Sequence, residues 1–484
     1  MPLLILTLLA ADRPATDPRG ADRFNVLMIV VDDMRCELGC YGAGRIDSPA
    51  IDRLASRGTL FERAYCQQAV CNPSRASVLT GLRPSTLGLY DLRTHFRDAR
   101  PNVVTLPQRF RHAGYFTRGI GKVFHNWVQP NRRGDSRSWS VPAVMHYFHH
   151  SDDVPYVGLV PNDEIAVPKA SRLDVPDEAY LDGRVAELGS RAIADYAASG
   201  RDEPWFLAVG FWKPHAPFNA PSSHWRRYDG RAITDPEPIE PPADVPDLAL
   251  HDGREITRGF RDNPNRRPTP EQTRTLRHGY YAAISYVDTQ VGRILDALDK
   301  SGQRDETIVV LWSDHGLHLG EQSLWGKTTN FELDVRVPLI IDAPGTPQGT
   351  RVSGLVELVD LYPTLTDWCG IDAPALDGES LVPLLRDPDG PGGDAAYSWH
   401  PRPAYVDEGE MPDAIGWSVR TDRYRLTDWR KYPNGDLIAT ELYDLSETDI
   451  ETENIAARRP ELVARLRPLL NTERERVPAS WRDE

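Results

Sequence analysis

The apolar residues of the chain form short continuous runs separated by amphipathic segments. The runs at 25–31, 205–211, 307–312 and 337–341 are rich in β-branched and aromatic residues, a pattern typical of strands buried on both faces. The pattern also predicts a short strand at 116–120 and helices at 49–57, 74–82, 104–113 and 273–300. Alternating strands and helices predict the α/β class, with a large, mostly parallel sheet flanked on both faces by helices.

The pattern of apolar runs and turn-forming residues changes beyond residue 376. Residues 387–394 (D-P-D-G-P-G-G-D) are all turn formers and predict an exposed loop. Short strand-like runs follow, which predicts a smaller C-terminal α+β subdomain over 377–484, after a catalytic domain at 23–376. These runs are 414–420, 424–428 and 441–444. A proline- and charge-rich stretch at 221–270 is expected to form an irregular surface excursion.

The N-terminus carries an apolar run at 2–11 that is similar to the core of a signal peptide, although no positive residues precede it. We expect residues 1–22 to be a signal remnant and linker, and the protein to be exported to the periplasm or outside the cell, or to lysosomes if it is eukaryotic. A frayed apolar terminus is the alternative. No run reaches the ~20 apolar residues that a membrane span requires, so none is predicted.

Charge and cysteine content narrow the function. A net charge of −15 argues against partners such as nucleic acid or anionic membranes. A site for an anion would therefore be a local basic pocket in an acidic surface. The five cysteines are an odd number, so at least one lies outside any intrachain disulfide.

Polar side chains follow three of the predicted strands. Asp32 and Asp33 end the first, Lys213 and His215 follow the second, and Asp314-His315 follow the third. Ligands of open α/β sheets bind at the carboxyl ends of the strands. The aspartates offer the oxygen ligands that a hard cation prefers, although a turn or helix cap would explain Asp32-Asp33 equally well.

The most specific motif is Cys71-Asn72-Pro73-Ser74-Arg75, followed by Leu79-Thr80-Gly81. A helix is predicted to begin beside Cys71. Its N-terminus could favour a thiolate and hold a sulfate or phosphate group. A buried structural cysteine is the alternative.

This motif resembles the C-x-P-S-R signature of type I sulfatases. Further segments are similar to the iduronate-2-sulfatase-like branch of that family, in the same order along the chain. They are N-V-L-M-I-V-V-D-D-M-R, Q-Q-A-V-C-N-P-S-R, G-K-V-F-H, A-V-G-F-W-K-P-H-A-P-F, S-D-H-G-L-H-L-G-E and K-T-T-N-F. The resemblance implies an alkaline-phosphatase-like sandwich with a smaller C-terminal subdomain, and hydrolysis of sulfate esters on a sulfated sugar or oligosaccharide.

The resemblance also implies roles for single residues. Cys71 would be converted to formylglycine by a formylglycine-generating enzyme, and its hydrate would attack sulfur and later expel the sulfate by elimination. The metal, usually Ca²⁺ with Mg²⁺ as an alternative, would be held by Asp32, Asp33, Cys71, Asp314 and His315. The catalytic residues would be Cys71, Arg75, Lys122, His125, His215 and Lys327. Substrate would contact Asp135, Lys213, His215 and Lys327. Within this set, His125 is the expected base and His215 the expected acid.

Three positions depart from the branch's pattern for gripping a sugar carboxylate: Gly88, Leu317 and Thr328. Asp135 is retained. Lost contacts change specificity more readily than reaction type, so a sulfated sugar other than iduronate 2-sulfate is expected. Two further functions stay open. One is a phosphate or phosphonate monoester hydrolase that uses the same site. The other is a non-catalytic binder of sulfated glycans.

Overall fold

The computed structural model describes residues 23–125, 134–146, 170–251, 253–257, 260, 267–406, 410–432 and 435–476. The predicted signal remnant and linker, residues 1–22, lie outside the described residues. In the described part of the chain, no helix combines the length and the apolar character that crossing a membrane requires.

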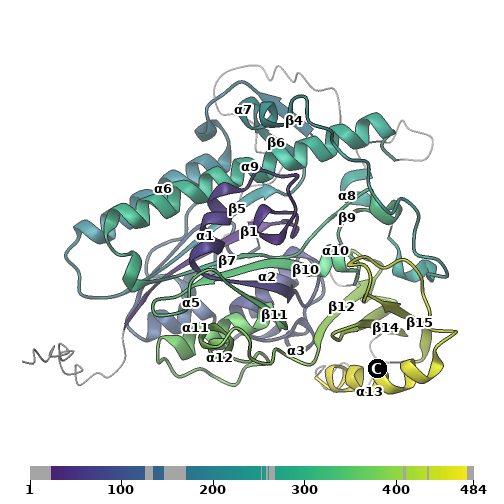
Figure 1. Ribbon diagram of the computed structural model, residues 1–484. Coiled ribbons are helices and arrows are strands. Elements are labelled where there is room, and N and C mark those ends of the chain that lie inside the picture. Colours follow the sequence, from purple (N-terminus) through teal and green to yellow (C-terminus); the bar gives the residue numbers. More distant parts are fainter. Residues whose placement is uncertain are drawn as a thin grey trace, which may run out of the picture.

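A seven-stranded sheet forms the centre of the protein (Figure 1). Its order is β11-β2-β10-β7-β1-β5-β3, and all neighbouring pairs are parallel except those that β10 makes with β2 and β7. The mostly parallel sheet predicted from the sequence is therefore confirmed, with one reversed strand. The strands are β1 (Asn25–Asp32), β2 (Thr59–Tyr65), β3 (Phe116–Gly121), β5 (Trp205–Pro214), β7 (Thr307–Ser313), β10 (Arg336–Asp342) and β11 (Thr350–Glu357).

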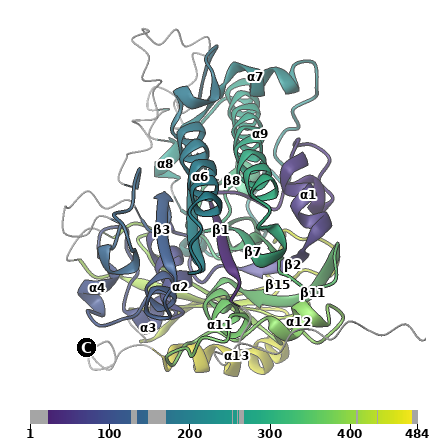
Figure 2. The same cartoon turned by 90° about the vertical axis from the view of Figure 1, so that its left-hand side faces the viewer.

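Helices cover both faces of this sheet, which explains why its central strands are apolar over most of their length (Figures 1 and 2). Leu27, Ile29 and Val31 of β1 join one core, whereas Val26 and Met28 join the other. The first core is closed by α1 (Pro49–Arg57), α6 (Leu181–Ala198) and α9 (Pro270–Ser301). The second is closed by α2 (Cys71–Thr80), α5 (Leu106–His112), α11 (Leu361–Trp368) and α12 (Val382–Arg386).

Local signals set the ends of the long helix α9. The Thr269 side chain accepts from the Gln272 amide, and the Gln272 side chain accepts from the Thr269 amide, which forms a capping box. Pro270 occupies the first turn, and Gly302 ends the helix with φ 72°. The predicted helix at 273–300 thus begins three residues earlier than the apolar pattern indicates.

The helix that carries the cysteine motif also differs from its prediction. α2 begins at Cys71, not at Ser74, and it ends at Thr80, where Gly81 adopts φ 68°. Pro73 is tolerated because the first amides of a helix have no intrahelical acceptor. Cys71 therefore lies within the first turn of the helix. None of the five cysteines is disulfide-bonded.

Several short elements lie outside the main sheet, and some break up the predicted irregular excursion at 221–270. The short helices are α3 (Pro84–Leu87), α4 (Phe96–Ala99), α7 (Ser222–Trp225), α8 (Arg254–Thr257) and α10 (Glu332–Val335). The short strands form two pairs, β4 (Ala170–Leu173) with β6 (Phe218–Pro221) and β8 (His318–Leu319) with β9 (Trp325–Gly326).

The C-terminal part forms a four-stranded antiparallel sheet covered by α13 (Pro460–Arg474) (Figure 1). Its strands are β12 (Ala396–Arg402), β13 (Ala414–Arg420), β14 (Tyr424–Lys431) and β15 (Leu437–Asp444). This confirms the small α+β subdomain, although the sequence pattern missed β12. Leu384 and Leu385 of α12 still pack in the core of the large sheet. The boundary at 376/377 stays a prediction.

Buried ion pairs connect the two parts. Glu332 of α10 accepts from Arg420 at 2.9 Å and from Arg425 at 2.5 Å, and both arginines belong to the C-terminal sheet. All three side chains are nearly inaccessible to solvent.

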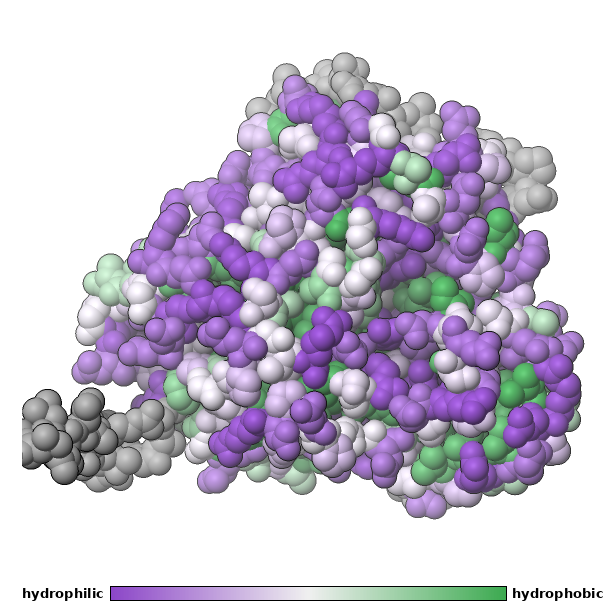
Figure 3. All heavy atoms as spheres, viewed as in Figure 1, coloured by the Kyte–Doolittle hydropathy of each residue, from purple (hydrophilic) through white to green (hydrophobic). Residues whose placement is uncertain are grey.

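The surface in Figure 3 is mostly hydrophilic, with apolar side chains in small groups.

Candidate functional site

The predicted strand-end residues meet at one edge of the sheet. β1 and β7 are adjacent and parallel, with Val31 opposite Ser313, so the residues that follow them emerge together. The Asp33 amide donates to Asp314 Oδ1 at 3.1 Å. Ser74 Oγ donates to the Asp314 carbonyl at 2.5 Å, which fixes the start of α2 at the same edge.

Asp33 adopts a left-handed backbone conformation, with φ 64°. Such a conformation is costly for a residue other than glycine and persists only where the surroundings enforce it. Tyr280 of α9 donates to the Asp33 carbonyl at 2.8 Å, and the next amide, of Met34, donates to Ser313 Oγ at 2.8 Å. These bonds turn the Asp33 carboxylate toward the cluster that contains Cys71.

Cys71 lies at the centre of the cluster and is 3% exposed. Its Sγ is 3.3 Å from His315 Nε2 and 3.6 Å from Lys327 Nζ. Burial, followed by the negative charge of Asp32, raises the pKa of the thiol well above its usual value, although Lys122 and Lys327 oppose this. A protonated thiol is a weak nucleophile, so the unmodified side chain is poorly suited to attack.

Arg75, one turn along α2, joins two carboxylates beneath Cys71. Its Nη2 is 2.9 Å from Asp32 Oδ1, and its Nε is 2.8 Å from Asp314 Oδ2. The remaining nitrogen, Nη1, donates to the carbonyls of Lys122 and Val123. All three charged side chains are fully buried. A guanidinium with this many acceptors holds the cluster in one geometry.

Two lysines bring further positive charge to the same place. Lys122 Nζ is 2.6 Å from Asp32 Oδ2, and Lys327 Nζ is 2.9 Å from Asp33 Oδ1. Lys122 comes directly after β3, where its carbonyl passes so close to Gly210 of β5 that a side chain at Gly210 would clash with it. Glycine at 210 therefore allows Lys122 to reach the cluster.

The cluster also holds the donor atoms of a cation site. One group of atoms within 4.8 Å of one another comes from Asp32, Asp33, Cys71 and His215, and a second comes from Cys71, Asp314 and His315. Burial raises the pKa of Asp33 to about 7 against the attraction of Lys327. A divalent cation would offset the repulsion among these carboxylates, and their oxygens suit a hard ion.

Two histidines flank the cluster. Burial lowers the pKa of His125 well below its usual value, and Lys122 and Arg75 add to this effect. His215 Nδ1 is 2.6 Å from the Ala216 carbonyl, and its Nε2 is 2.7 Å from Glu255 Oε1. Burial, together with Lys327, lowers the pKa of His215, although Glu255 opposes this effect. At neutral pH the His125 imidazole is therefore uncharged, as a proton acceptor must be.

Glu255 is a site residue that the sequence analysis missed. Besides His215, it contacts Lys327 Nζ at 3.3 Å and accepts from the Tyr405 hydroxyl at 3.1 Å. Burial disfavours its charged form, but Lys327 and His215 hold the pKa of Glu255 well below its usual value. It lies on α8, inside the stretch predicted to be irregular, where no local motif marks it.

Two predicted substrate residues lie in other surroundings. Lys213 directs Nζ toward the carbonyls of Pro217, at 2.8 Å, and His215, at 3.3 Å. Asp135 is paired with Arg97 through both oxygens, at 2.5 and 2.8 Å. These contacts of Lys213 help to shape the loop that carries His215. Its predicted contact with substrate stays a prediction.

The structure also shows the surroundings of the three positions that depart from the expected pattern for binding a sugar carboxylate. Gly88 ends α3 with φ 72°, a conformation that glycine adopts without strain. Leu317 and Thr328 are both fully buried, as are the charged residues of the Cys71 cluster.

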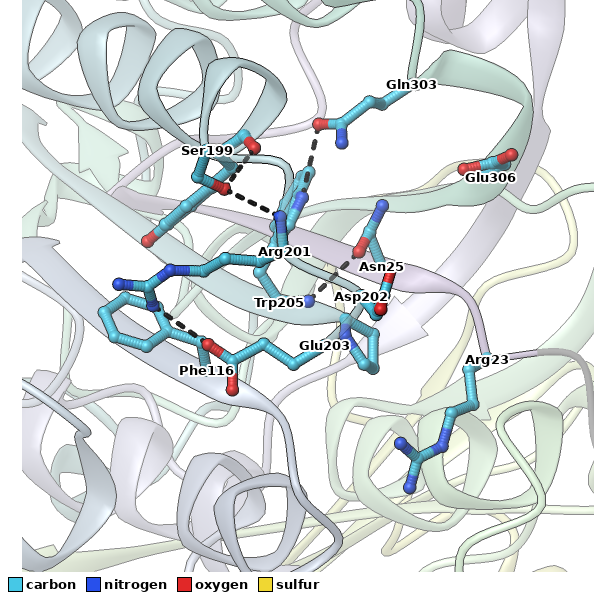
Figure 4. Close-up of a pocket in the computed structure, with 12 residues that line it drawn as sticks. Arg23, Asn25, Phe116, Ser199, Arg201, Asp202, Glu203, Trp205, Gln303 and Glu306 are labelled. Carbon is cyan, nitrogen blue, oxygen red and sulfur yellow. Dashed lines mark hydrogen bonds and ion pairs between the residues drawn. The ribbon is translucent and has the colours of Figure 1, made fainter. Parts of the chain in front are cut away.

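A second pocket, of about 140 Å³, lies at the opposite edge of the sheet, where β1 and β5 begin (Figure 4). Of its charged residues, Arg201 pairs with Glu203 at 2.9 Å, and Arg23 donates to the Ala113 carbonyl at 3.0 Å. Asn25 accepts from the Trp205 amide at 3.0 Å. The residues that line this pocket include no cysteine or histidine, so it is not an alternative to the Cys71 cluster as a catalytic centre.

Comparisons with known proteins agree with this geometry. The Sulfatase family model matches residues 24–371, and the model for the C-terminal region of N-sulphoglucosamine sulphohydrolase matches 320–476. Human iduronate 2-sulfatase is 35% identical over 90% of this chain and 91% of its own length, and choline-sulfatase of Rhizobium meliloti (strain 1021) is 32% identical over 75% and 71%.

Among solved structures, a phosphonate monoester hydrolase from Silicibacter pomeroyi superposes with a TM-score of 0.73 at 26% identity. The match covers 94% of this chain and 96% of that one. Together with the family model, these similarities confirm the alkaline-phosphatase-like sandwich and the activity class of a sulfuric ester hydrolase. The chain belongs to the sulfatase family.

Proposed function

We propose that this enzyme hydrolyses sulfate esters of a carbohydrate, with formylglycine derived from Cys71 as nucleophile and a divalent cation, Ca²⁺ in preference to Mg²⁺. The observation that carries the proposal is the position of Cys71. Its Sγ lies at the start of α2, 3.3 Å from His315 and 3.6 Å from Lys327, above carboxylates that Arg75 holds together. The helix N-terminus and the lysines together favour a tetrahedral anion at this place.

The modified side chain supplies, in its hydrated form, an oxygen nucleophile and a second hydroxyl through which sulfate is eliminated. The surrounding residues do the remaining work. Lys122 and Lys327 offset the charge on the sulfate oxygens, and Arg75 keeps the nucleophile oriented. His125 accepts the proton of the second hydroxyl, and His215 donates a proton to the departing alcohol. The maturation partner is a formylglycine-generating enzyme.

The cation would be held by Asp32, Asp33, Asp314 and His315, together with the oxygen of the modified Cys71. It supplies positive charge beside the nucleophile and the sulfate. It would also replace the lysines as the counter-charge of the carboxylates, which leaves the ammonium groups of Lys122 and Lys327 to the anionic substrate.

Adding Ca²⁺ to chelator-treated protein is expected to stabilise it. At a free concentration 100 times the Kd, the gain in free energy of unfolding is about 2.7 kcal/mol. Denaturant unfolding with and without Ca²⁺ measures it. Asp33→Asn should lose most of the gain, whereas Asp244→Asn, at an exposed aspartate, should retain it. An equal gain in both variants would place the ion elsewhere.

A sulfated sugar is the proposed substrate. Human iduronate 2-sulfatase, by its name, acts on a sulfated sugar acid, and it aligns with nine-tenths of this chain. Gly88, Leu317 and Thr328 depart from the pattern that the resemblance implies for holding a sugar carboxylate. We therefore expect another sulfated sugar, with Asp135 contributing to its recognition.

The rates on an aryl sulfate and the matching aryl phosphate test the reaction. We expect purified enzyme with a confirmed aldehyde at position 71 to cleave the sulfate faster. The phosphonate monoester hydrolase, similar to this chain over its whole fold, makes phosphate or phosphonate cleavage the second candidate. If the aryl phosphate is cleaved faster than the aryl sulfate, the enzyme is a phosphate or phosphonate hydrolase.

Export is proposed from the apolar N-terminal run. N-terminal sequencing of protein from its native host is expected to show that residues 1–22 have been shortened by cleavage, and an intact Met1 would contradict this.

A further inference from the structure

Glu255 and Tyr405 add to the site a feature that the sulfate-cleaving residues do not require. Tyr405 follows β12 in the C-terminal subdomain, and Glu255 belongs to α8 of the catalytic domain. The hydroxyl of Tyr405 donates to Glu255 Oε2 at 3.1 Å. The other carboxylate oxygen, Oε1, lies 2.7 Å from His215 Nε2 and 3.3 Å from Lys327 Nζ.

These contacts define the charge of Glu255. The lysine ammonium and the tyrosine hydroxyl both present hydrogens to it, and a carboxyl group that only accepts hydrogen bonds is ionised. Its neighbours also fix its direction, because Tyr405 holds one oxygen while Lys327 and His215 hold the other. The site thus contains a fixed negative charge that is separate from the carboxylates of the cation cluster.

Glu255 is the most exposed of the four side chains that link Asp33 to it. Exposure is 0% at Asp33, 2% at Lys327, 11% at His215 and 19% at Glu255. With the sulfate group at Cys71, beside Lys327, an alcohol that leaves toward His215 would lie beside Glu255, whose Oε1 is 2.7 Å from His215 Nε2.

A negative charge in this place has a direct consequence for the alcohol part of the substrate. With the charge of Lys327 engaged by the sulfate group, a second carboxylate within a few ångströms of Glu255 would be repelled, because the partly buried surroundings screen charges weakly. Hydroxyl or ammonium groups would instead donate to the lone pair of Glu255 that Tyr405, Lys327 and His215 leave open. Like-charge placement of this kind sets specificity by penalising the wrong ligand.

We infer that Glu255, held by Tyr405, is a specificity-determining residue that selects sulfate esters whose alcohol carries hydroxyl or amino groups and excludes those with a carboxylate on the same sugar ring. This inference rests on the proposed function, since it concerns the alcohol released by the same site. It assigns the substrate to neutral or amino sugars, in contrast to sulfated sugar acids.

A matched pair of substrates tests the inference: the methyl glycoside of glucuronic acid 2-sulfate and its methyl ester, which differ in the charge of one group. The full-length, aldehyde-bearing enzyme is expected to favour the methyl ester in kcat/KM by about tenfold or more. In Glu255→Gln the ratio should fall toward one, mainly through a lower KM for the free acid. Glu240→Gln, at an exposed glutamate, should keep the wild-type ratio.

Other results of this experiment would contradict the inference or limit the role of Glu255. A wild-type preference for the free acid overturns the inference, and so does a ratio that Glu255→Gln leaves unchanged. If that variant lowers both rates equally, Glu255 only positions His215. If it does not fold, the wild-type ratio alone decides. An ester that the enzyme does not hydrolyse is tested instead as a competitive inhibitor of p-nitrophenyl sulfate hydrolysis. The ratio of the two inhibition constants then takes the place of the ratio of kcat/KM values. Failure to cleave p-nitrophenyl sulfate itself would instead contradict the proposed function.

Discussion

Replacement of Cys71 by serine is expected to lower kcat by a factor on the order of 10³ or more, while the fold is retained. Serine offers one hydroxyl, so attack on sulfur leaves a sulfate ester that cannot be expelled by elimination. Position 71 is enclosed by α2 and the cation cluster, and serine is smaller than cysteine, so the packing tolerates the change. Steady-state hydrolysis of p-nitrophenyl sulfate measures the loss.

The mass of the protein separates this explanation from simple loss of structure. After incubation with substrate, Cys71→Ser should carry one covalent sulfate, whereas the wild type should carry formylglycine and no adduct. Cys40→Ser is the matched control, because Cys40 lies outside the cluster and is half-buried. Substantial turnover by Cys71→Ser would exclude the elimination step.

Replacement of Arg75 by methionine is expected to cost about 3–5 kcal/mol of unfolding free energy in the metal-free protein. The change removes the partner of two fully buried carboxylates, Asp32 and Asp314, and it orphans the carbonyls of Lys122 and Val123. Chemical denaturation in the presence of a chelator measures the cost. Hydrolysis should fall by about 10² or more, because the nucleophile loses its support.

An exposed arginine provides the comparison. Arg53 pairs with Asp296 at 2.6 Å, but both side chains are about half exposed, so Arg53→Met should cost only about 0–1 kcal/mol. Added Ca²⁺ should stabilise Arg53→Met as much as the wild type, and it should narrow the difference in stability between Arg75→Met and the wild type. Equal costs in the two variants would show that Arg75 does not organise the cluster.

Much of the site could be predicted because its parts obey local rules. The apolar run at 25–31 identified β1, and the polar residues at its end had to lie at the carboxyl edge of the sheet. The same argument brought Asp314 and His315 to that edge. Cys71, Arg75, Lys122, His125 and Lys327 came from motifs rather than from periodicity.

Other features depend on contacts between distant segments. β10 resembles the parallel strands in composition, and only its pairing with β2 and β7 shows that it runs in the opposite direction. The first turn of α2 extends back to Cys71 because Ser74 bonds to the Asp314 carbonyl, 240 positions away. Neither effect leaves a mark in the local pattern of apolar residues.

The sequence by itself determined the layered α/β fold, the position of the proposed nucleophile and most of the charged cluster, because strand burial and the Cys71 motif are encoded over a few neighbouring residues. Only the tertiary structure decided what surrounds the proposed position of the departing alcohol. It turned Lys213 toward backbone carbonyls, and it brought Glu255 and Tyr405, 150 positions apart, to His215 and Lys327. The physical reason is that side-chain charges act through space, and the partners of a loop residue are set by the packing of the whole chain.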